Sequence, residues 1–266
     1  MLLRVGNLSK NFGGLIAVDE VSFDVSEGKI QAIIGPNGAG KTTILNLICG
    51  LDRPSKGLIE FKGINITHMP AYKIATFGLA RTFQNIQLFG QMSVLENVMT
   101  GLYLKSKTGF VRAGLWFPSV DREEETFKER AYELLHFMDL SSRADSIAST
   151  LPYGEQRLLE IARALAVNPT LLLLDEPAAG LNAQETALLG EKIKKMKELG
   201  ITILIVEHDM KLVMKISDEI IVLNYGRKIA QGTPSSIRND PRVISAYLGM
   251  RKGMSVYQPT QEVMIS

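Results

Sequence analysis

The apolar residues at the start of the chain fall into short runs of strand length. Residues 2–5 and 21–25 have the pattern of half-buried strands, the second with a clear alternation of apolar and polar positions. IQAII at 30–34 is an almost unbroken apolar run, which is typical of a central strand that is covered on both faces. LIEFKG at 58–63 predicts a further strand that ends in a turn glycine.

Between about residues 70 and 165 the pattern becomes helical. The stretch DREEETFKERAYELLHFM at 121–138 repeats its apolar residues at helical spacing. That spacing places one set of side chains on a single face, namely Phe127, Ala131, Leu134, Leu135 and Met138. We therefore predict a helical region in the middle of the chain.

Strand patterns return in the last third of the chain. LLLLDEP at 171–177 and ITILIVEHD at 201–209 are typical of buried strands, and a helix is predicted between them at 183–200. One side of that helix is expected to be apolar, through Leu189, Ile193 and Met196. Its lysines are interpreted as a solvated face, formed by Lys192, Lys194, Lys195 and Lys197. EIIVLNYGRKIAQG at 219–232 predicts a hairpin.

The order of these elements predicts an α/β fold with a mostly parallel core sheet and a helical subdomain. We place the domain at residues 1–250, with the helical subdomain inserted at about 88–167. Residues 251–266 show no apolar periodicity and are expected to form a loosely ordered tail. The chain has 266 residues, of which 45% are hydrophobic, so it has ample material for a core.

Charge and cysteine content narrow the function classes. The net charge of +2 is far from that of a basic domain, so we expect no nucleic-acid partner. The single cysteine, Cys49, lies in an apolar helical run and is interpreted as packing in a reducing cytoplasm. No signal peptide is predicted, and the longest apolar runs are far shorter than the roughly 20 residues that cross a bilayer. Any work at a membrane would therefore need a partner.

A glycine-rich segment between the strand at 30–34 and the next helix has the chemistry of a phosphate site. It reads GPNGAGKT and fits G-x-x-x-x-G-K-[ST] in the required strand–helix context. Its glycines let backbone N–H groups face a phosphate chain, and the helix N-terminus adds positive potential. Lys41 is expected to reach the β- and γ-phosphates, and the Thr42 hydroxyl to bind Mg²⁺. The predicted nucleotide contacts here are Gly35, Pro36, Asn37, Gly38, Ala39, Gly40, Lys41, Thr42 and Thr43.

Polar residues that end the two later buried strands add catalytic chemistry. Asp175 suits a contact to Mg²⁺, and the adjacent Glu176 is placed to polarise an attacking water. The strand that ends at His208 should lie beside the Asp175 strand, so we predict that its imidazole reaches the γ-phosphate. His68 and His136 have no such context and are interpreted as ordinary residues. Together these groups indicate an enzyme that hydrolyses a nucleoside triphosphate.

The stretch STLPYGEQR at 149–157 has a simple local interpretation as a helix start. Pro152 ends a loop, Gly154 makes a turn, and Glu155 favours the positive end of the helix dipole. The rest of the chain changes that interpretation. The phosphate loop, this stretch and the strand ends at Asp175 and His208 follow one another in an order that is typical of a known family. In that order they resemble the ATP-binding subunit of ABC transporters, over about residues 3–249.

The resemblance implies the remaining site residues and the fold. It implies an ABC ATPase core with an N-terminal antiparallel β-subdomain. Phe12 resembles the aromatic residue that stacks on adenine, and Val18 is expected beside it. Gln84 resembles the glutamine that senses Mg²⁺ and the attacking water and links the site to the membrane subunit. The roles implied for Asp175, Glu176 and His208 are the metal-side acid, the catalytic base and the γ-phosphate histidine.

STLPYGEQR falls where this family carries its signature, usually Leu-Ser-Gly-Gly-Gln, which binds the γ-phosphate held by a second subunit. The resemblance therefore implies a head-to-tail dimer that sandwiches two ATP molecules, with Tyr153, Gly154 and Glu155 as contacts across it. The segment 179–182 is implied to touch the opposite subunit. This sequence departs from the family pattern at Pro152, Tyr153 and Glu155, and Asn182 stands where an aspartate is usual.

The same departures resemble one branch of the family. A tyrosine-bearing signature followed by LEIARAL, with AAGLN and AYLG, is similar to the branched-chain (hydrophobic) amino-acid importer ATPases. This implies two transmembrane permease subunits, a separate substrate-binding protein, a self or paralogous ATPase partner, and a place on the cytoplasmic face of the cell membrane. The alternatives are an ATPase of lipid or lipopolysaccharide export and a soluble ABC ATPase of translation or repair. A GTP switch is excluded by the lack of an N/T-K-x-D guanine reader.

The surface for the permeases is expected in the helical region after Gln84. Apolar side chains gather there, namely Leu88, Phe89, Met92 and Val94. An insertion at about 103–125 is similar to one that the importer ATPases carry. Its Trp116 and Phe117 fit either an exposed partner contact or a small satellite core.

Overall fold

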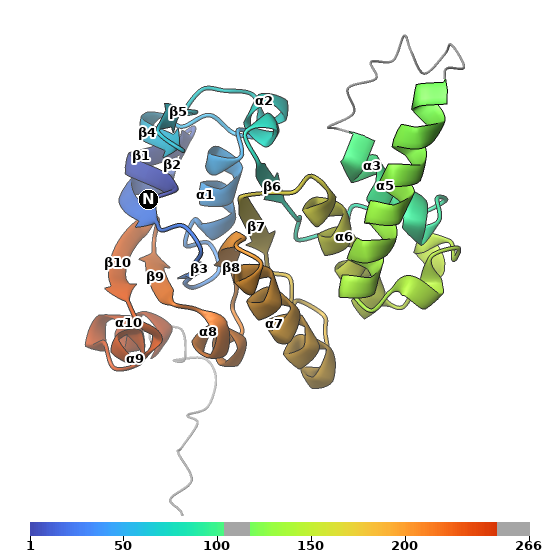
Figure 1. Ribbon diagram of the computed structural model, residues 1–266. Helices are drawn as coiled ribbons and strands as arrows, with labels where there is room; N and C mark the ends of the chain where they lie inside the picture. The colour runs from blue at the N-terminus through green and yellow to red at the C-terminus, as the bar shows by residue number, and fades with distance from the viewer. Residues whose placement is uncertain (104–117, 249–266) are drawn as a thin grey trace, which may run out of the picture.

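The computed structural model describes residues 1–103 and 118–248. Two sheets and the helices that cover them form the larger part of the molecule (Figure 1). The N-terminal sheet is antiparallel, in the order β2-β1-β4-β5, with bounds β1 Leu3–Phe12, β2 Leu15–Val25, β4 Lys56–Phe61 and β5 Ile64–Asn65. The antiparallel subdomain is thus present, and its first two strands are longer than the sequence predicts.

The second sheet is the mostly parallel sheet that the sequence predicts. Its order is β10-β9-β3-β8-β7-β6, and every neighbouring pair is parallel except β9 and β10. Its strands are β3 Ile30–Ile34, β6 Leu79–Arg81, β7 Leu171–Asp175, β8 Thr202–Val206, β9 Glu219–Asn224 and β10 Arg227–Gly232. The sequence analysis missed β6, which lies inside the stretch predicted as helical.

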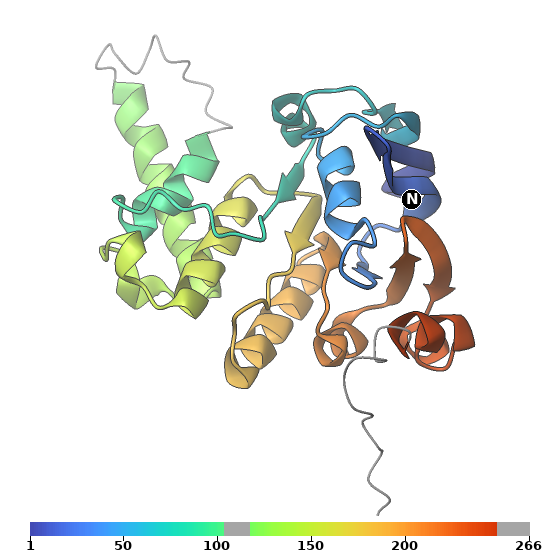
Figure 2. The ribbon, with the colours of Figure 1, turned by 180° about the vertical axis from the view of Figure 1, so that it is seen from behind.

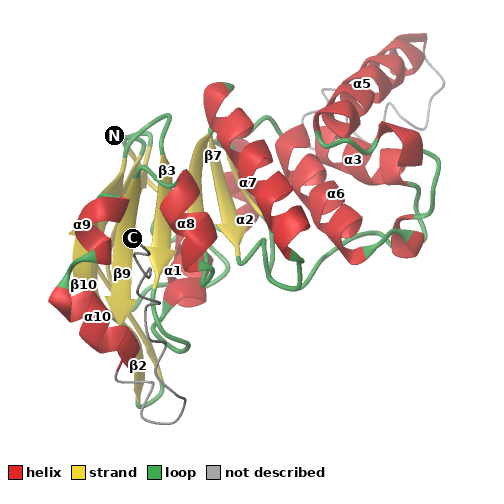
Figure 3. Ribbon diagram, turned by 90° about the horizontal axis from the view of Figure 1, so that it is seen from below, coloured by secondary structure: helices red, strands yellow, loops and turns green. Residues whose placement is uncertain are grey.

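Helices cover both faces of the parallel sheet (Figure 3). On one face α1 packs between the two sheets, and on the other face α7 and α8 pack against the alternate strand residues. The bounds are α1 Lys41–Ile48, α2 Ala71–Thr76, α7 Ala183–Glu198, α8 Met210–Ile216, α9 Pro234–Arg238 and α10 Pro241–Leu248. All five residues of β3, β7 and β8 are buried, which explains their continuous apolar patterns.

The helical subdomain stands to one side of the sheets, as Figures 1 and 2 show. It contains α3 Val94–Tyr103, α5 Pro118–Phe137 and α6 Tyr153–Ala166, with short 3-10 turns η1 Ser141–Arg143 and η2 Ala148–Thr150. The predicted apolar face of α5 packs into the core of this subdomain. The insertion predicted at 103–125, with Trp116 and Phe117, lies largely outside the described residues, as does the tail at 251–266.

One lysine of α7 does not lie on the solvated face that the sequence predicts. Lys192 has only 4% of its surface exposed, and its ammonium donates to the Phe137 carbonyl and pairs with Asp139 at 2.6 Å. Those partners lie at the end of α5, where free carbonyls attract a cation. Lys192 therefore joins the helical subdomain to α7.

We expect Gly101→Ala to loosen the packing of α3 against α6. A Cβ at Gly101 would lie 2.6 Å from the Arg163 carbonyl oxygen and 2.8 Å from the Ala166 Cβ, so the two helices would have to separate. Overpacking of this kind costs about 1–3 kcal/mol of unfolding free energy. Thermal unfolding should show a lower midpoint, and Gly14→Ala, whose Cβ meets no atom within 4 Å, serves as the control for a glycine outside a packed interface. An unchanged midpoint for Gly101→Ala would contradict this account.

Candidate functional site

The phosphate loop joins the end of β3 to the start of α1, and only glycine fits at two of its positions. Gly40 has a φ of 95°, and a Cβ there would lie 2.4 Å from the Ala17 carbonyl oxygen. A Cβ at Gly35 would lie 2.3 Å from the Leu223 carbonyl oxygen. The loop is therefore held tightly between β2 and the end of β9, and its backbone amides lie at the N-terminus of α1.

Lys41, the first residue of α1, turns its side chain back over this loop. Its ammonium donates to the carbonyl oxygens of Gly35 at 2.8 Å and Pro36 at 3.0 Å. Burial lowers the pKa of Lys41 from its usual value, and the carboxylates of Glu176 and Asp175 oppose that shift. The charges of Lys41, Asp175 and Glu176 therefore interact with one another around the loop.

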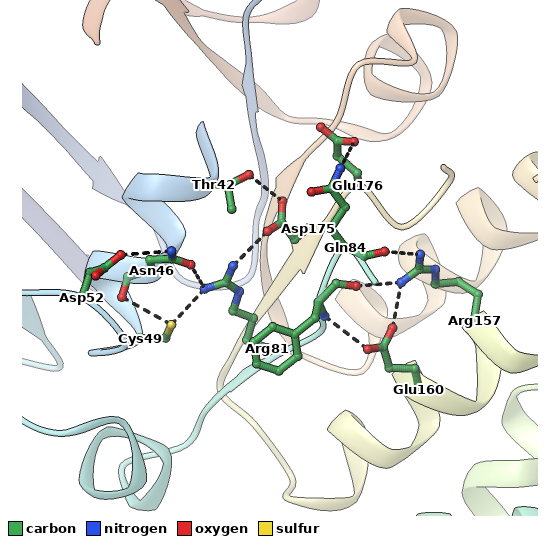
Figure 4. A network of polar contacts seen from close by, with 11 residues as sticks. Thr42, Asn46, Cys49, Asp52, Arg81, Gln84, Arg157, Glu160, Asp175 and Glu176 are labelled. Carbon is green, nitrogen blue, oxygen red and sulfur yellow. Dashed lines mark hydrogen bonds and ion pairs between the residues drawn. The ribbon is translucent and has the colours of Figure 1, made fainter. Parts of the chain in front are cut away.

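The metal-side residues meet where β7 ends (Figure 4). Asp175 is fully buried, and its Oδ1 lies 3.5 Å from the Thr42 Oγ1. Its Oδ2 accepts a hydrogen bond from the Arg81 Nη2 at 2.9 Å. Burial raises the pKa of Asp175, and the Arg81 guanidinium opposes that shift. Arg81 belongs to β6, so the strand that the sequence analysis missed supplies the partner of this carboxylate.

These oxygen atoms fit Mg²⁺ in its usual protein environment. The described residues contain no group of three or more His, Cys, Asp or Glu side chains that could hold a metal by themselves. Mg²⁺ commonly binds through one or two protein oxygens together with substrate phosphates and water. A hydroxyl and a carboxylate that face each other beside a phosphate loop match that pattern, and Gln84, whose Nε2 donates to Glu176, lines the same cleft as Thr42 (Figure 4).

Three predicted catalytic side chains converge beyond Asp175. The Gln84 Nε2 donates to the Glu176 Oε2 at 3.2 Å, and the His208 Nδ1 lies 3.7 Å from the same oxygen. Glu176 has a φ of 47°, in the left-handed region, directly after β7. Because β7 and β8 are parallel neighbours, their carboxyl ends bring Glu176 and His208 together, as the sequence predicts.

A cleft of about 600 Å³ opens over the phosphate loop. Its walls hold Phe12, Leu15, Ile16, Ala17, Asn37, Gly38, Ala39, Gly40, Lys41, Thr42, Thr43, Gln84, Glu176 and His208. Phe12 lies half exposed at the rim, where the Lys10 ammonium is 4.6 Å from its ring centre. Val18 is fully buried and does not line the cleft, because its side chain packs inward while Leu15, Ile16 and Ala17 face the opening.

The predicted signature residues do not line the cleft of their own chain. Tyr153, Gly154 and Glu155 form the first turn of α6, after Pro152 at the N-cap. A Cβ at Gly180 would lie 2.9 Å from the Tyr153 Cε1, so the ring covers the loop after β7. Glu155 pairs with Arg143 at 3.2 Å. Any phosphate contact from this turn would therefore be to a nucleotide outside this cleft.

A buried ion pair joins α6 to the Gln84 segment, and the sequence analysis did not identify it. The Arg157 guanidinium donates to the carbonyl oxygens of Phe83 and Gln84, both at 2.8 Å, and to the Tyr153 hydroxyl at 3.1 Å. It also pairs with Glu160 at 2.8 Å, and both side chains are almost fully buried (Figure 4). The start of α6 and the Gln84 segment are thus fixed to each other.

Asn182 has a local role that its position in the family pattern does not reveal. It is the N-cap of α7, and its side chain accepts hydrogen bonds from the backbone N–H groups of Gln184 and Glu185. The Glu185 carboxylate accepts from the Asn182 N–H in return, which completes a capping box. An Asn-x-x-Glu search at helix starts would have found this feature.

Comparison with known families and proteins agrees with this geometry. Residues 18–179 match the family model described as ABC transporter, and residues 227–249 match one described as branched-chain amino acid ATP-binding cassette transporter. The chain is 46% identical to the high-affinity branched-chain amino acid transport ATP-binding protein BraF of Pseudomonas aeruginosa and 45% identical to LivG of Escherichia coli. Each alignment covers 93% of this chain and 98% of the relative.

Solved structures give the same result. A nucleotide-free ATP-binding cassette from an ABC transporter superposes with a TM-score of 0.81 at 34% identity, covering 92% of this chain and 98% of that one. An ADP conformation of such a cassette gives 0.81 at 35% identity, covering 93% and 98%. With the phosphate loop, the carboxylate pair and the histidine gathered in one cleft, the sequence relatives and the structural neighbours lead to one conclusion: the chain belongs to the ATP-binding subunits of the ABC transporter family.

Proposed function

We propose that the chain binds and hydrolyses MgATP to power the import of branched-chain and other hydrophobic amino acids through two partner membrane permeases. The observation that carries the ATPase part is the convergence of Glu176, Gln84 and His208 beside the phosphate loop. The amino-acid substrate is supported by the match over residues 227–249 and by the names of the relatives. A separate substrate-binding protein would deliver the amino acid.

The reaction follows from the positions of the side chains. Thr42 and Asp175 would hold Mg²⁺, and the ion would supply charge neutralisation at the phosphates. Glu176 accepts a proton from the water that attacks the γ-phosphorus, while Gln84 orients that water. Lys41 and His208 stabilise the charge that develops on the transferred group. Phe12 binds the adenine face at the rim of the cleft.

The working unit is proposed to be a head-to-tail dimer, with an identical or a paralogous partner. The first turn of α6 lies away from the cleft of its own chain, so its N–H groups are free to complete a cleft on a second chain. A related cassette, 27% identical with a TM-score of 0.75, has been solved as a dimer in a post-hydrolysis state with ADP and Pi. That arrangement in a relative supports the same one here.

The permeases are proposed to bind a groove between the sheet and the helical subdomain, which places the subunit on the inner face of the membrane. The groove has a volume of about 460 Å³ and is lined by Phe83, Phe89 and Arg163, among others. Phe89 is 52% exposed. The predicted surface needs one correction, because Val94 is fully buried in the core of the helical subdomain and cannot contact a partner. Among the described residues, no helix is long and apolar enough to cross a membrane.

Phe89→Asp tests the groove and the transport function together. We expect the isolated variant to hydrolyse ATP at close to the normal rate, and vesicles that carry it with the two permeases to lose ATP-dependent leucine uptake by about tenfold or more, since a central aromatic anchor contributes about 2 kcal/mol or more. Leu199→Asp, at an exposed apolar residue beyond α7, is the control. If wild-type vesicles hydrolyse ATP but move no amino acid, the importer function is wrong.

Pro152→Ser is expected to strengthen the ATP-bound dimer. Pro152 is the N-cap of α6 and provides neither a hydroxyl nor an N–H at that position. Serine would supply both, and it is also a better N-cap by about 1 kcal/mol. Sedimentation at several protein concentrations, in the presence of ATP and in a slowly hydrolysing background, should show a lower dissociation constant. Weaker dimerisation would contradict the proposed contact of this turn with ATP.

A further inference from the structure

The residue before His208 is a buried carboxylate that the ATPase mechanism does not use. Glu207 follows β8 directly and has 0% of its surface exposed. Its backbone N–H donates to the Ile33 carbonyl oxygen at 3.4 Å, so it lies where β3 and β8 end. Burying a carboxylate is costly unless hydrogen bonds satisfy it, so its partners show what the residue does.

Three backbone N–H groups satisfy this carboxylate, and they come from two different loops. The Oε1 accepts from the Ala178 N–H at 2.7 Å. The Oε2 accepts from the N–H groups of His208 at 2.9 Å and Asp209 at 3.3 Å. The second oxygen therefore shapes the turn that carries His208, and the first reaches a segment 29 residues away in the sequence.

The segment that Ala178 belongs to carries both the catalytic base and the proposed contact to the second subunit. Glu176 precedes Ala178 by two residues, and Gly180 follows it by two and lies under the Tyr153 ring. The Glu176 and His208 side chains also approach each other, with the Nδ1 and Oε2 atoms 3.7 Å apart. One carboxylate thus connects the main chains of Glu176 and His208, the two groups that are proposed to face the γ-phosphate.

We propose that Glu207 is a positioning residue that ties the 176–181 segment to the His208 turn, so that a shift of that segment at the dimer interface also moves His208. The inference rests on the proposed ATPase function. If Glu207 only shaped the local turn, its hydrogen bonds from His208 and Asp209 would be enough. The additional hydrogen bond from Ala178 joins that turn to the 176–181 segment.

Glu207→Gln separates these roles, because the two side chains have the same size. Glutamine has one acceptor oxygen and one NH₂ donor, so it can satisfy the Ala178 side or the His208 side but not both. We expect kcat for ATP hydrolysis to fall by about tenfold or more, while the KM for ATP stays within about twofold of the wild-type value. The substitution should weaken stabilisation of the transition state and leave nucleotide binding unchanged. A wild-type kcat in this variant would overturn the proposal.

A double-mutant cycle with His208→Ala identifies the route of the effect. If Glu207 acts through His208, Glu207→Gln should lower kcat much less in the His208→Ala background than in the wild type, whereas independent effects would multiply. If the double variant lowers kcat by the product of the two single-variant factors, the proposal is overturned. The matched control is Asp218→Asn, whose carboxylate accepts from the Ile30 N–H at 2.8 Å at the opposite end of the sheet and should leave kcat unchanged.

Two further results keep the test decisive. If Glu207→Gln does not fold, hydrogen exchange of the wild type should show the amides of Ala178, His208 and Asp209 opening together, and clearly unequal protection would overturn the proposal. Wild-type protein that binds ATP but never hydrolyses it, alone or with permeases, would instead refute the proposed ATPase function, a failure that is distinct from a wild-type kcat in Glu207→Gln.

Discussion

Glu176→Gln should leave ATP binding intact and slow hydrolysis by about 10²–10⁴-fold, the range that a general base contributes. Glutamine keeps the size of the side chain and a hydrogen-bonding partner for Gln84, but it cannot accept the proton of the attacking water. Because the γ-phosphate then persists, the ATP-bound dimer should accumulate instead of dissociating. This is the largest kinetic effect that we expect from one substitution in the chain.

Three measurements test that expectation. Phosphate release gives the hydrolysis rate, equilibrium binding of a fluorescent ATP analogue gives the affinity, and sedimentation with ATP gives the oligomeric state. Glu198→Gln, at an exposed carboxylate at the end of α7, is the control and should behave as the wild type. If Glu176→Gln stays monomeric with ATP, the isolated subunit does not form the sandwich dimer. If it hydrolyses ATP at the normal rate, Glu176 is not the base.

Arg157→Met should cause the largest loss of stability. It leaves Glu160 buried without its cation, and it removes the donors to the Phe83 and Gln84 carbonyl oxygens. Breaking a buried pair from one side costs about 3–5 kcal/mol of unfolding free energy. In a domain of this size each kcal/mol lowers the melting midpoint by about 2–4 °C. Since these bonds hold the Gln84 segment on α6, hydrolysis should also fall.

The double variant Arg157→Met, Glu160→Met distinguishes an unpaired charge from lost packing. Replacing both partners removes the isolated carboxylate, so the double variant should regain part of the lost stability, although the N–H groups of Phe83 and Gln87 then lose Glu160 as their acceptor. The matched control is Arg130→Met on α5, where an exposed pair with Glu133 at the same spacing contributes about 0–1 kcal/mol. Calorimetry or denaturant titration measures all of them. A double variant that is less stable than Arg157→Met would contradict this explanation.

The elements with the strongest patterns could be predicted from the sequence alone. The buried run at 30–34 is a strand with those bounds. The apolar stretch before His208 is its parallel neighbour β8, and the stretch before Asp175 is β7, the parallel neighbour of β8 in the same sheet. A strand buried on both faces is apolar at nearly every position, with Gln31 the exception in β3, so its pattern can be recognised without knowledge of its neighbours. The phosphate loop is equally local, because the motif and the fold that it needs occupy one short segment.

Apart from the local capping box at Asn182, the features that were missed depend on distant residues. β6 has three residues, and it is a strand because Leu79–Arg81 pair with Leu171–Leu173 of β7, a contact that no local pattern records. Lys192 resembles its neighbours Lys194 and Lys195 in the sequence, and only the end of α5 makes it a buried residue. Arg157 and Glu160 look like an ordinary helical pair until the Phe83 and Gln84 carbonyls are placed against them.

The contact between Tyr153 and Gly180 limits how this subunit could evolve or be redesigned. Gly180 has a φ of 80°, and a Cβ there would meet the Tyr153 ring, so the two positions share one volume. A glycine at 153, as in the usual family signature, would empty that volume, but the left-handed φ would still favour glycine, asparagine or aspartate at 180. We therefore expect position 180 to stay glycine wherever position 153 is aromatic, and an engineer who restores the usual signature here leaves a void that only a residue tolerating a left-handed backbone could fill from position 180.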